Sequence, residues 1–427
     1  MSKSQKFYFA LYILIYIILL SLFAFLRVKP ISSFTFIYIS SSVVFILISW
    51  QILKQDLTAN FIYVLLALAV IIRLAFIPLH PIGSDDYYRY VWDGKVQAHG
   101  INPYAFAPND TALNSLHDEI LPKLVNHPEM KTIYPPLTEI IFYFSFLIGG
   151  DSFVGLKILM FIFDFLTLFG LYLIIKKQNL PLRNILLYAL GPLIIFQLFI
   201  DAHADGFGLP FLIFSIYFYL DKKKIGSYIF LGLSICIKPL GLIIIPIYFI
   251  SEQKLIDRLK PVIIPLLICG LFYLPYTFTG TPFQALMKFT ENWTFNGVVF
   301  NTLDYFIHDN QISRLLCALL LIITYLPVVL SKKDLLSKIY ISIFLLFIFS
   351  PVVHPWYVVW LGLLLPVIPR WSGIIFTSLI SFTAFTVLNY QLTGVWKEYI
   401  VVLIIEYLPV IIFFIYELYK QKYFKYI

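Results

Sequence analysis

The chain has few charged residues for its length. Asp, Glu, Lys and Arg make up 13% of the 427 residues, while hydrophobic residues make up 60%. A soluble domain carries about a quarter charged residues, so this composition argues against a soluble globular fold. The apolar residues recur in runs of about 20, the length at which a helix crosses the hydrocarbon core of a bilayer. We therefore expect an integral membrane protein.

Cysteine is also scarce. The three cysteines, Cys236, Cys269 and Cys317, each lie in an apolar stretch, and their spacing fits neither a disulfide framework nor a zinc site. We interpret them as small buried side chains. The sequence contains no internal repeat, no low-complexity tract and no appended soluble domain, so residues 1–427 are expected to form a single integral membrane domain.

Basic residues outnumber acidic ones, with 31 Lys and Arg against 23 Asp and Glu, giving a net charge of +8. They fall in short clusters between apolar runs, as in the cytoplasmic loops of membrane proteins. A surface that follows nucleic-acid phosphates would instead need a continuous basic stripe. We therefore expect membrane lipids, and not nucleic acid, around this chain.

The apolar runs predict an all-α, polytopic transmembrane bundle of about 11–14 membrane helices. The expected spans are residues 8–26, 32–51, 60–79, 152–175, 184–200, 206–220, 261–277, 314–330, 339–353, 356–369, 371–388 and 398–418. Residues 80–151 are polar and are expected to form a long, partly helical external loop. Within this loop, the short apolar run 136–149 predicts an interfacial helix.

The topology of the second half depends on residues 226–250, an apolar run interrupted at Lys238-Pro239. With a cytoplasmic N-terminus and a hairpin of two half-helices here, most basic residues fall on the cytoplasmic side, as the positive-inside rule requires. A single span would instead carry the basic cluster 254–260 outside. The hairpin is favoured, and it places the loop 80–151 and all seven histidines on the external face.

The stretch 81–104 holds the acidic pair Asp85 and Asp86, directly after a predicted span. Adjacent carboxylates repel each other, so one can have a raised pKa and act as a general base, or the pair can hold a cation. The alternative is structural. A capped interfacial helix starts here, and Arg89 and Asp93 share a face with the pair in ordinary ion pairs.

The string SDDYYRYVWDGKVQAHGINPYAFAP, beginning at Ser84, resembles GT-C-type glycosyltransferases, which are integral membrane enzymes that use polyprenyl-linked sugars. It is similar in particular to the bacterial polyprenol-phosphate-mannose-dependent mannosyltransferases. Two further strings fit that group, IYPPL at 133–137 and HPWY at 354–357. The resemblance thus extends over most of the chain.

The resemblance implies that Asp85 or Asp86 deprotonates an acceptor hydroxyl, which attacks the anomeric carbon of the donor and expels polyprenyl phosphate. We prefer Asp85 as the base and Asp86 as the residue that positions the acceptor. Direct attack with one base predicts inversion at the anomeric carbon. No cofactor is expected, and a divalent metal is not favoured because Arg, Lys and His can bind a phosphate monoester.

A leaving phosphate needs cationic partners. The candidates are Arg89 and Lys95 in the loop, Arg73 in the outer half of its span, and Lys238 at the tip of the hairpin. A charge within the bilayer is costly, which marks Arg73 and Lys238 as functional candidates. The alternatives are that Arg73 extends to the membrane surface, and that Lys238 is an ordinary cytoplasmic lysine.

Polar residues at other expected helix ends face the same side. His203 and Asp205 offer phosphate contacts or metal ligands, or they form only a polar turn. His354 begins a late helix, and Trp356 either stacks on sugar or belongs to the interfacial aromatic belt. We also expect Tyr134 to shape the cavity.

The external loop 292–297 offers Trp293 and Asn296 to an acceptor sugar. The sequence therefore predicts a multi-pass glycosyltransferase of the bacterial inner membrane with an external active site, which transfers a hexose, preferably mannose, from a polyprenyl-phosphate donor to a glycan, lipid or protein. Two alternatives stay open: a lipid-glycan flippase without covalent chemistry, and transfer of another sugar such as aminoarabinose to lipid A. Polar residues that gather at one face favour the enzyme.

Overall fold

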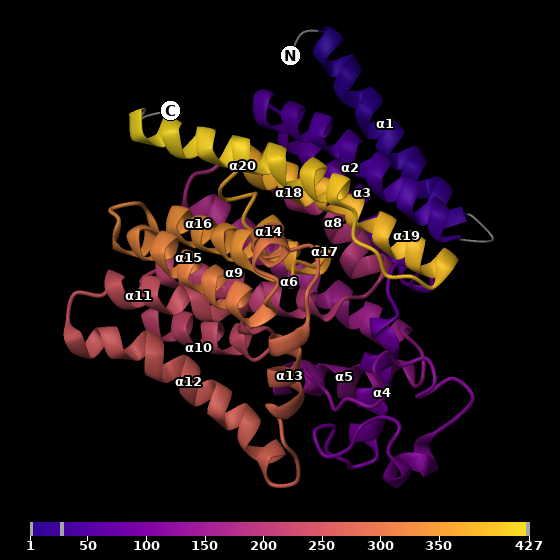
Figure 1. The fold of residues 1–427 in the computed structure, drawn as a ribbon. Helices are drawn as coiled ribbons and strands as arrows, with labels where there is room; N and C mark the ends of the chain where they lie inside the picture. Colours follow the sequence, from indigo (N-terminus) through magenta and orange to yellow (C-terminus); the bar gives the residue numbers. More distant parts are fainter. Residues whose placement is uncertain (1–2, 26–29, 424–427) are drawn as a thin grey trace.

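A computed structural model describes residues 3–25 and 30–423, and this part of the chain consists of helices and connecting segments without a β-strand (Figure 1). The helices are α1 (Lys3–Phe25), α2 (Ile31–Lys54), α3 (Ala59–Phe76), α4 (Asp86–Ala98), α5 (Pro136–Gly149), α6 (Val154–Lys177), α7 (Leu186–Ala189), α8 (Pro192–Ile194), α9 (Leu209–Leu220), α10 (Lys224–Ile235), α11 (Ile245–Ser251), α12 (Leu255–Thr277), α13 (Gln284–Asn292), α14 (Val298–Ile307), α15 (Asn310–Leu330), α16 (Leu335–Phe349), α17 (Pro355–Gly362), α18 (Trp371–Leu379), α19 (Ala384–Thr393) and α20 (Ile400–Tyr423). The all-α prediction is confirmed.

Among the described residues, seven helical segments are long and apolar enough to cross a membrane. They are Phe7–Phe25, Ile31–Lys54, Ala59–Phe76, Val154–Lys177, Asn310–Leu330, Trp371–Thr393 and Ile400–Lys420. The protein is therefore a multi-pass membrane protein. Several other expected spans are short or broken helices, because proline lacks the N–H that an uninterrupted helix needs. The expected span 184–200, for example, bends by 44° between Leu182–Ala189 and Pro192–Ile200.

The predicted hairpin at 226–250 is confirmed. Helix α10 ends at Ile235, and the helical structure is interrupted at Lys238-Pro239. A 3-10 turn (Pro239–Ile244) and α11 then return the chain toward the start of α10. The two arms end side by side, with Lys224 Nζ 2.8 Å from Glu252 Oε1. Lys238 therefore lies at the tip of the hairpin, at the opposite end from the lysine cluster 222–224.

The long polar segment carries α4, a short 3-10 helix (Thr111–Leu116) and α5, and it projects from one edge of the bundle in Figure 1. The short helix expected at 136–149 is α5, with the same bounds. Helices α4 and α5 approach closely at Gly94, where an added Cβ would collide with the carbonyl oxygen of Phe142. This close approach joins the start of the segment to its end, and so sets the direction of α4.

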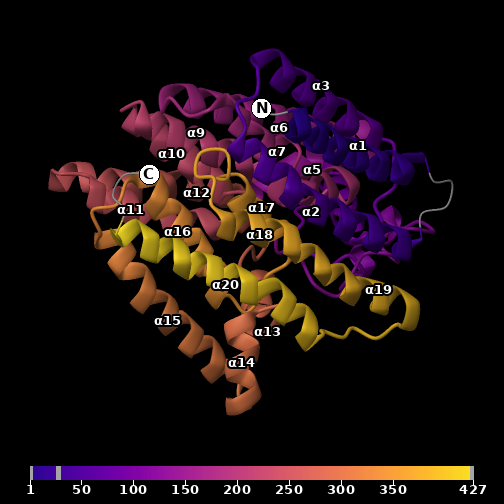
Figure 2. The ribbon, with the colours of Figure 1, turned by 90° about the horizontal axis from the view of Figure 1, so that it is seen from above.

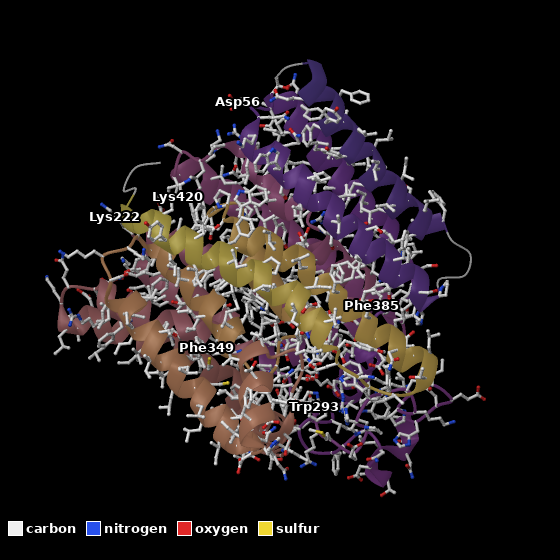
Figure 3. The ribbon with its side chains drawn as sticks, turned by 45° about the horizontal axis from the view of Figure 1, so that its top comes forward. Asp56, Lys222, Trp293, Phe349, Phe385 and Lys420 are labelled. Atoms are coloured by element: carbon white, nitrogen blue, oxygen red, sulfur yellow. The ribbon has the colours of Figure 1, made fainter. Side chains whose placement is uncertain are left out.

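The two ends of the bundle differ in character. In Figure 3, Asp56, Lys222 and Lys420 lie toward one end, and Trp293 lies toward the other. Figure 2 shows the C-terminal α20 alongside α18. We call the end that carries Asp85 and Asp86 the acidic end, and the opposite end the lysine-rich end.

The structure brings two of the cysteines together. Cys236 is buried and Cys269 is half-buried, and their Sγ atoms lie 3.5 Å apart as free thiols between α10 and α12. Cys317 is buried elsewhere. The interpretation of small buried side chains holds for Cys236 and Cys317, whereas the sequence spacing gave no indication of the Cys236–Cys269 contact.

An ion pair inside the bundle joins three helices. Arg73 Nε on α3 lies 2.7 Å from Asp164 Oδ2 on α6, and both side chains are almost fully buried. Tyr188 of α7 donates to the other Asp164 oxygen at 2.8 Å, and Arg73 also donates to the carbonyl of Ala189. The snorkelling alternative for Arg73 is therefore wrong, because its guanidinium is held inside the protein.

Replacement of Asp164 by Ala is expected to leave the Arg73 charge buried without a partner. Loss of one partner of a buried pair costs about 3–5 kcal/mol, so the midpoint of thermal unfolding in detergent should fall clearly. Asp56→Ala is the matched control, because Asp56 pairs with Arg183 while its side chain is 98% exposed, and exposed pairs contribute little. Equal midpoints for the two variants would contradict a role for Asp164 in holding the bundle together.

Candidate functional site

The acidic pair lies where the chain leaves α3 and enters α4. Asp85 is the residue that precedes the helix, as the sequence indicated, but its side chain does not cap it. Asn126 holds both carboxylates instead: its Nδ2 lies 2.7 Å from Asp86 Oδ1 and 3.2 Å from Asp85 Oδ1. Asp85 is exposed, whereas Asp86 points inward with 19% of its side chain exposed. The pair is thus one clamped unit with an outer and an inner carboxylate.

The inner carboxylate faces the turn at His203. This histidine follows the π-helical segment Ile195–Ile200 and is fully buried, and its Nδ1 lies 3.6 Å from Asp86 Oδ2. Neither ring nitrogen of His203 has a hydrogen-bond partner. A buried imidazole normally finds such a partner, so His203 keeps unused hydrogen-bonding capacity beside the carboxylate.

Lys238 reaches the same place from the tip of the hairpin. Its Nζ lies 3.3 Å from Asp205 Oδ2 and 3.8 Å from the ring centroid of Tyr357. The indole N–H of Trp360 donates to the other Asp205 oxygen at 3.0 Å. Asp205 and Lys238 therefore form a part-buried ion pair at the acidic end.

The start of α17 contributes stacked rings. His354 precedes the helix and Pro355 occupies its first turn, as expected from the sequence. The Trp356 ring stacks on His203 with centroids 3.8 Å apart, and on His354 at 4.2 Å. Both contacts are nearly parallel, with interplanar angles of 14° and 7°. Trp356 therefore sits between the two imidazoles within the site, which differs from an interfacial belt position.

Tyr134 lies behind the acidic pair. Its ring meets Tyr90 edge to face at 5.2 Å, and the Tyr90 hydroxyl lies 3.4 Å from Asp86 Oδ2. The Tyr104 hydroxyl donates to the Tyr134 carbonyl. Tyr134 thus packs against the first turn of α4, which presents Asp86.

Burial and the neighbouring carboxylate control the ionisation of this pair. Burial, followed by the charge of Asp85, raises the pKa of Asp86 to about 6. The hydrogen bond from Asn126, the charge of Lys238 and the hydrogen bond from Tyr90 act in the opposite direction. Burial also raises the pKa of Asp85 above its usual value. A carboxyl group with a pKa near 6 can accept a proton and release it near neutral pH.

Three expected cations do not join this group. Arg73 is held by Asp164, as described above. Arg89 donates to the carbonyls of Met130, Asn126 and His127 and so fixes the loop that carries the clamp. Lys95 forms ion pairs with Asp118 at 2.8 Å and with Asp151 at 3.2 Å. Each has a structural partner, and we leave all three out of the site.

The loop 292–297 also differs from expectation. Both the amide side chain and the backbone of Asn296 are engaged by acidic residues, Glu406 and Glu398. Asn296 is therefore buried within the protein and is not free for an acceptor. Trp293 meets the ring of His127 edge to face at 4.6 Å, next to the Asn126 clamp. Sequence reasoning missed Asn126 and Glu406, because neither belongs to a recognisable motif.

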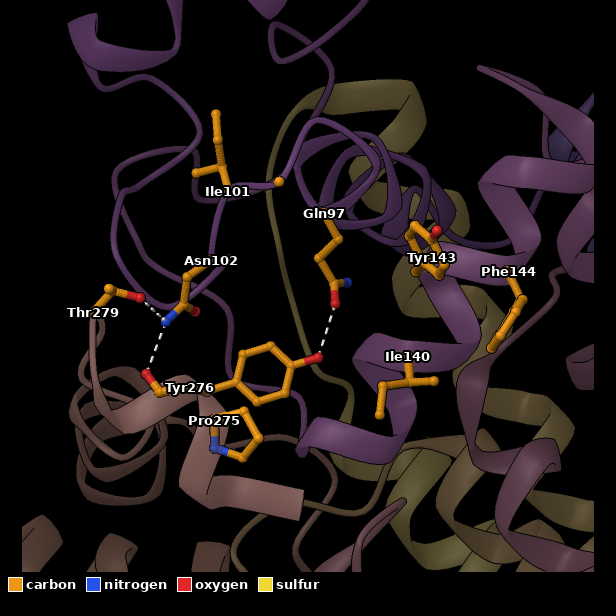
Figure 4. Close-up of a pocket in the computed structure, with 10 residues that line it drawn as sticks. Gln97, Ile101, Asn102, Ile140, Tyr143, Phe144, Pro275, Tyr276 and Thr279 are labelled. Carbon is orange, nitrogen blue, oxygen red and sulfur yellow. Dashed lines mark hydrogen bonds between the residues drawn. The ribbon is translucent and has the colours of Figure 1, made fainter. Parts of the chain in front are cut away.

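A separate hollow lies at the far end of α4 (Figure 4). This cavity of about 430 Å³ is lined by Gln97, Asn102 and Tyr276 on its polar side. The Tyr276 hydroxyl donates to Gln97, and Asn102 donates to the Tyr276 carbonyl and to Thr279. Gln97 follows Asp86 by three helical turns, or about 16 Å at 1.5 Å per residue. The hollow thus lies between the loop and α12, at a distance from the acidic pair.

No group of three or more His, Cys, Asp or Glu side chains is close enough to hold a metal ion within residues 3–25 and 30–423. The site as described consists of a carboxylate pair, a part-buried Lys–Asp pair, two imidazoles and an indole. This arrangement can accept a proton from a hydroxyl and provide a cation and hydrogen bonds for an anion.

Comparison with protein families gives a match over the first part of the chain. Residues 17–251 match the family described as alpha-(1->6)-mannopyranosyltransferase, N-terminal domain. The match covers more than half of the 427 residues. It includes the acidic pair, the His203 turn and the hairpin, and it ends before His354. No curated protein matches the chain.

Proposed function

We propose a function from the premise that the chain belongs to the alpha-(1->6)-mannopyranosyltransferase family, a GT-C-like mannosyltransferase family, and is a membrane glycosyltransferase. It transfers mannose from a polyprenyl-phosphate-linked donor to a glycan, lipid or protein acceptor at the external face of the bacterial inner membrane. The observation that carries the proposal is the inner carboxylate Asp86, which lies 3.6 Å from His203 Nδ1 and close enough to Lys238 for its charge to lower the pKa of Asp86.

In this proposal Asp86 is the base and Asp85 supports it. This reverses the preference drawn from the sequence, because Asp86 points inward and Asp85 is exposed. Asp86 takes the proton of the acceptor hydroxyl while the hydroxyl oxygen bonds to the anomeric carbon of the donor. The bond between this carbon and the phosphate oxygen breaks at the same time. The electron pair leaves with polyprenyl phosphate. A single displacement inverts the configuration, so an α-linked product requires a β-linked donor.

Lys238 and His203 are the groups proposed to meet the leaving phosphate. The charge of Lys238 is balanced by Asp205, and a fixed cation stabilises negative charge that develops on a leaving oxygen. One of the two unpartnered ring nitrogens of His203 carries the hydrogen of the neutral imidazole and can donate it to the same phosphate. Trp356 is covered on both faces by imidazoles, so its proposed role is to hold them and not to stack on sugar.

Replacement of Asp86 by Asn is expected to lower kcat by about 10²–10⁴-fold, the range for loss of a general base. Asp85→Asn should reduce it by less. The measurement is mannose transfer by the purified full-length protein in proteoliposomes, with polyprenyl-phosphate-mannose and a set of candidate acceptors. Asp110→Asn is the control, because an amide can still accept the hydrogen bond from the N–H of Ala112 in the same loop. Full activity of Asp86→Asn would overturn the role of this residue.

The pH profile tests the same assignment. Activity requires the carboxylate form of Asp86, so kcat/KM should fall as the pH decreases through about 6. The charge of Asp85 raises this pKa and the hydrogen bond from Asn126 lowers it. The acidic limb should therefore move to lower pH in Asp85→Asn and to higher pH in Asn126→Ala. Shifts with the opposite signs, or no shifts, would contradict Asp86 as the titrating group.

The sidedness of the site can be tested by labelling. With the three native cysteines replaced by alanine, single cysteines at exposed Glu119 in the loop and exposed Gln178 at the lysine-rich end report the two faces. In intact spheroplasts, a membrane-impermeant maleimide should label Glu119→Cys only. Labelling of Gln178→Cys becomes possible after the membrane is permeabilised. The reverse pattern would place the acidic end in the cytoplasm.

A further inference from the structure

The two imidazoles and the indole of the site belong to a longer stack. Phe295 stacks on His354 with centroids 4.6 Å apart and an interplanar angle of 21°. His354 stacks on Trp356, and Trp356 stacks on His203. We call Phe295, His354, Trp356 and His203 the ring column. One end of the column is His203, which faces Asp86, and the other end is Phe295 in the loop before α14.

Phe295 is fixed to the column by its backbone. Its N–H donates to the Pro351 carbonyl at 3.0 Å, and its carbonyl accepts from the Val353 N–H at 2.7 Å. These bonds attach the loop directly before His354. The next residue, Asn296, has a φ of +54°, in the left-handed region that Asn adopts more readily than most other residues except glycine. Hydrogen bonds to acidic and aromatic side chains hold Asn296 in this position.

Residues on α20 and just before it hold Asn296 by hydrogen bonds. The Asn296 side chain donates to Glu406 Oε2 at 2.9 Å, and its carbonyl accepts from the Tyr407 hydroxyl at 2.8 Å. Its N–H donates to Glu398, just before α20, at 2.8 Å. Glu406 is fully buried within an apolar helix, and its Oε1 has no hydrogen-bond partner. A carboxyl group inside a membrane helix is costly and usually serves a function.

We propose that Glu406 is a positioning residue for the active site: it holds Asn296, which pins Phe295 at the end of the ring column, and the column holds His203 beside Asp86. The matched segment 17–251 does not include Glu406, Asn296, Phe295 or the rings at the start of α17. The C-terminal part of the chain therefore completes a site whose acidic pair and lysine come from the N-terminal part. The effect on sugar transfer rests on the proposed function, whereas the effect on His203 does not.

Two substitutions separate positioning from simple loss of stability. Glu406→Gln keeps an oxygen that accepts the hydrogen bond from Asn296, and Glu406→Leu removes it. Glu417→Leu is the matched control on the same helix, three turns further on, where the carboxylate accepts from the N–H and hydroxyl of Ser372. It disturbs α20 at a part-buried carboxylate without touching the column.

The first measurement is the reactivity of His203 with diethyl pyrocarbonate, followed by mass spectrometry of the full-length protein in proteoliposomes. His203 is fully buried and should be protected in the native protein, while His127, whose side chain is 51% exposed, serves as the internal reference. Modification of His203 is expected to rise several-fold in Glu406→Leu and to stay at the native level in Glu406→Gln and Glu417→Leu.

The second measurement is the kinetics of mannose transfer. A reacting group displaced by about 1 Å costs about 10²-fold, so Glu406→Leu should lose kcat on that order with little change in KM, and Glu406→Gln should retain it. Phe295→Ala, which removes the end of the column without altering Glu406, should also expose His203, and it replaces Glu406→Leu if that variant does not fold.

The outcomes are distinct. Native protection of His203 in both Glu406→Leu and Phe295→Ala would overturn the proposal, as would a Glu406→Gln variant as impaired as Glu406→Leu. A loss of kcat in Glu417→Leu equal to that in Glu406→Leu would reduce Glu406 to a stability role. If the native protein transfers no mannose, the proposed function fails, and the protection of His203 still decides the role of Glu406.

Discussion

Inside the bilayer no water is present to form hydrogen bonds with the backbone groups that a helix break leaves free. This constraint determines where the candidate site lies. Backbone that leaves helical geometry inside a membrane protein is tolerated only where protein or a cavity surrounds it. The breaks that matter here are the turn at His203, the hairpin tip at Lys238-Pro239 and the start of α17 at His354-Pro355. All three meet at the acidic end. The polar side chains that these breaks carry are thereby gathered beside Asp86.

Charge pairing decides which ions are free for chemistry. Arg73, Arg89 and Lys95 are each held by carboxylates or carbonyls that tie helices or loop segments together. Lys238 also has a carboxylate partner, but Asp205 and Lys238 sit beside the His203 turn, and about a quarter of the Lys238 side chain is exposed. Asp86 shares Asn126 with Asp85 and keeps a raised pKa. The partners of each charged side chain, and their place in the fold, therefore distinguish the structural ions from the ions of the site.

The site also joins parts of the chain that lie far apart in sequence. Asp86 and Asn126 come from the loop, His203 from the turn before α9, Lys238 from the hairpin, and Trp356 from α17. The ring column extends this connection to the loop before α14 and, through Asn296, to α20. A family match that ends at residue 251 thus describes the acidic pair and the lysine, but not the segment that holds His203 in place.

Much of this protein could be predicted from sequence because the relevant signals are local. Long apolar runs predict membrane helices, proline predicts breaks such as Lys238-Pro239, and an acidic pair after a span predicts where α4 begins. The number of full crossings was less predictable, because a run such as 184–200 has the composition of a span and bends by 44° at Gly191-Pro192. Hydropathy measures how apolar a segment is, and it contains no information on direction.

The sequence by itself determined the membrane class, the all-α architecture, the hairpin and the set of residues from which a site could be built. Only the tertiary structure decided which of them meet. Arg73 and Lys238 are both cations in apolar stretches, yet one is paired with Asp164 inside the bundle and the other lies with Asp205 at the site. Asn126 and Glu406 belong to no motif, and they matter only through partners 40 and 110 residues away. Pairing energy depends on distance in space, and the packing of the helices sets that distance.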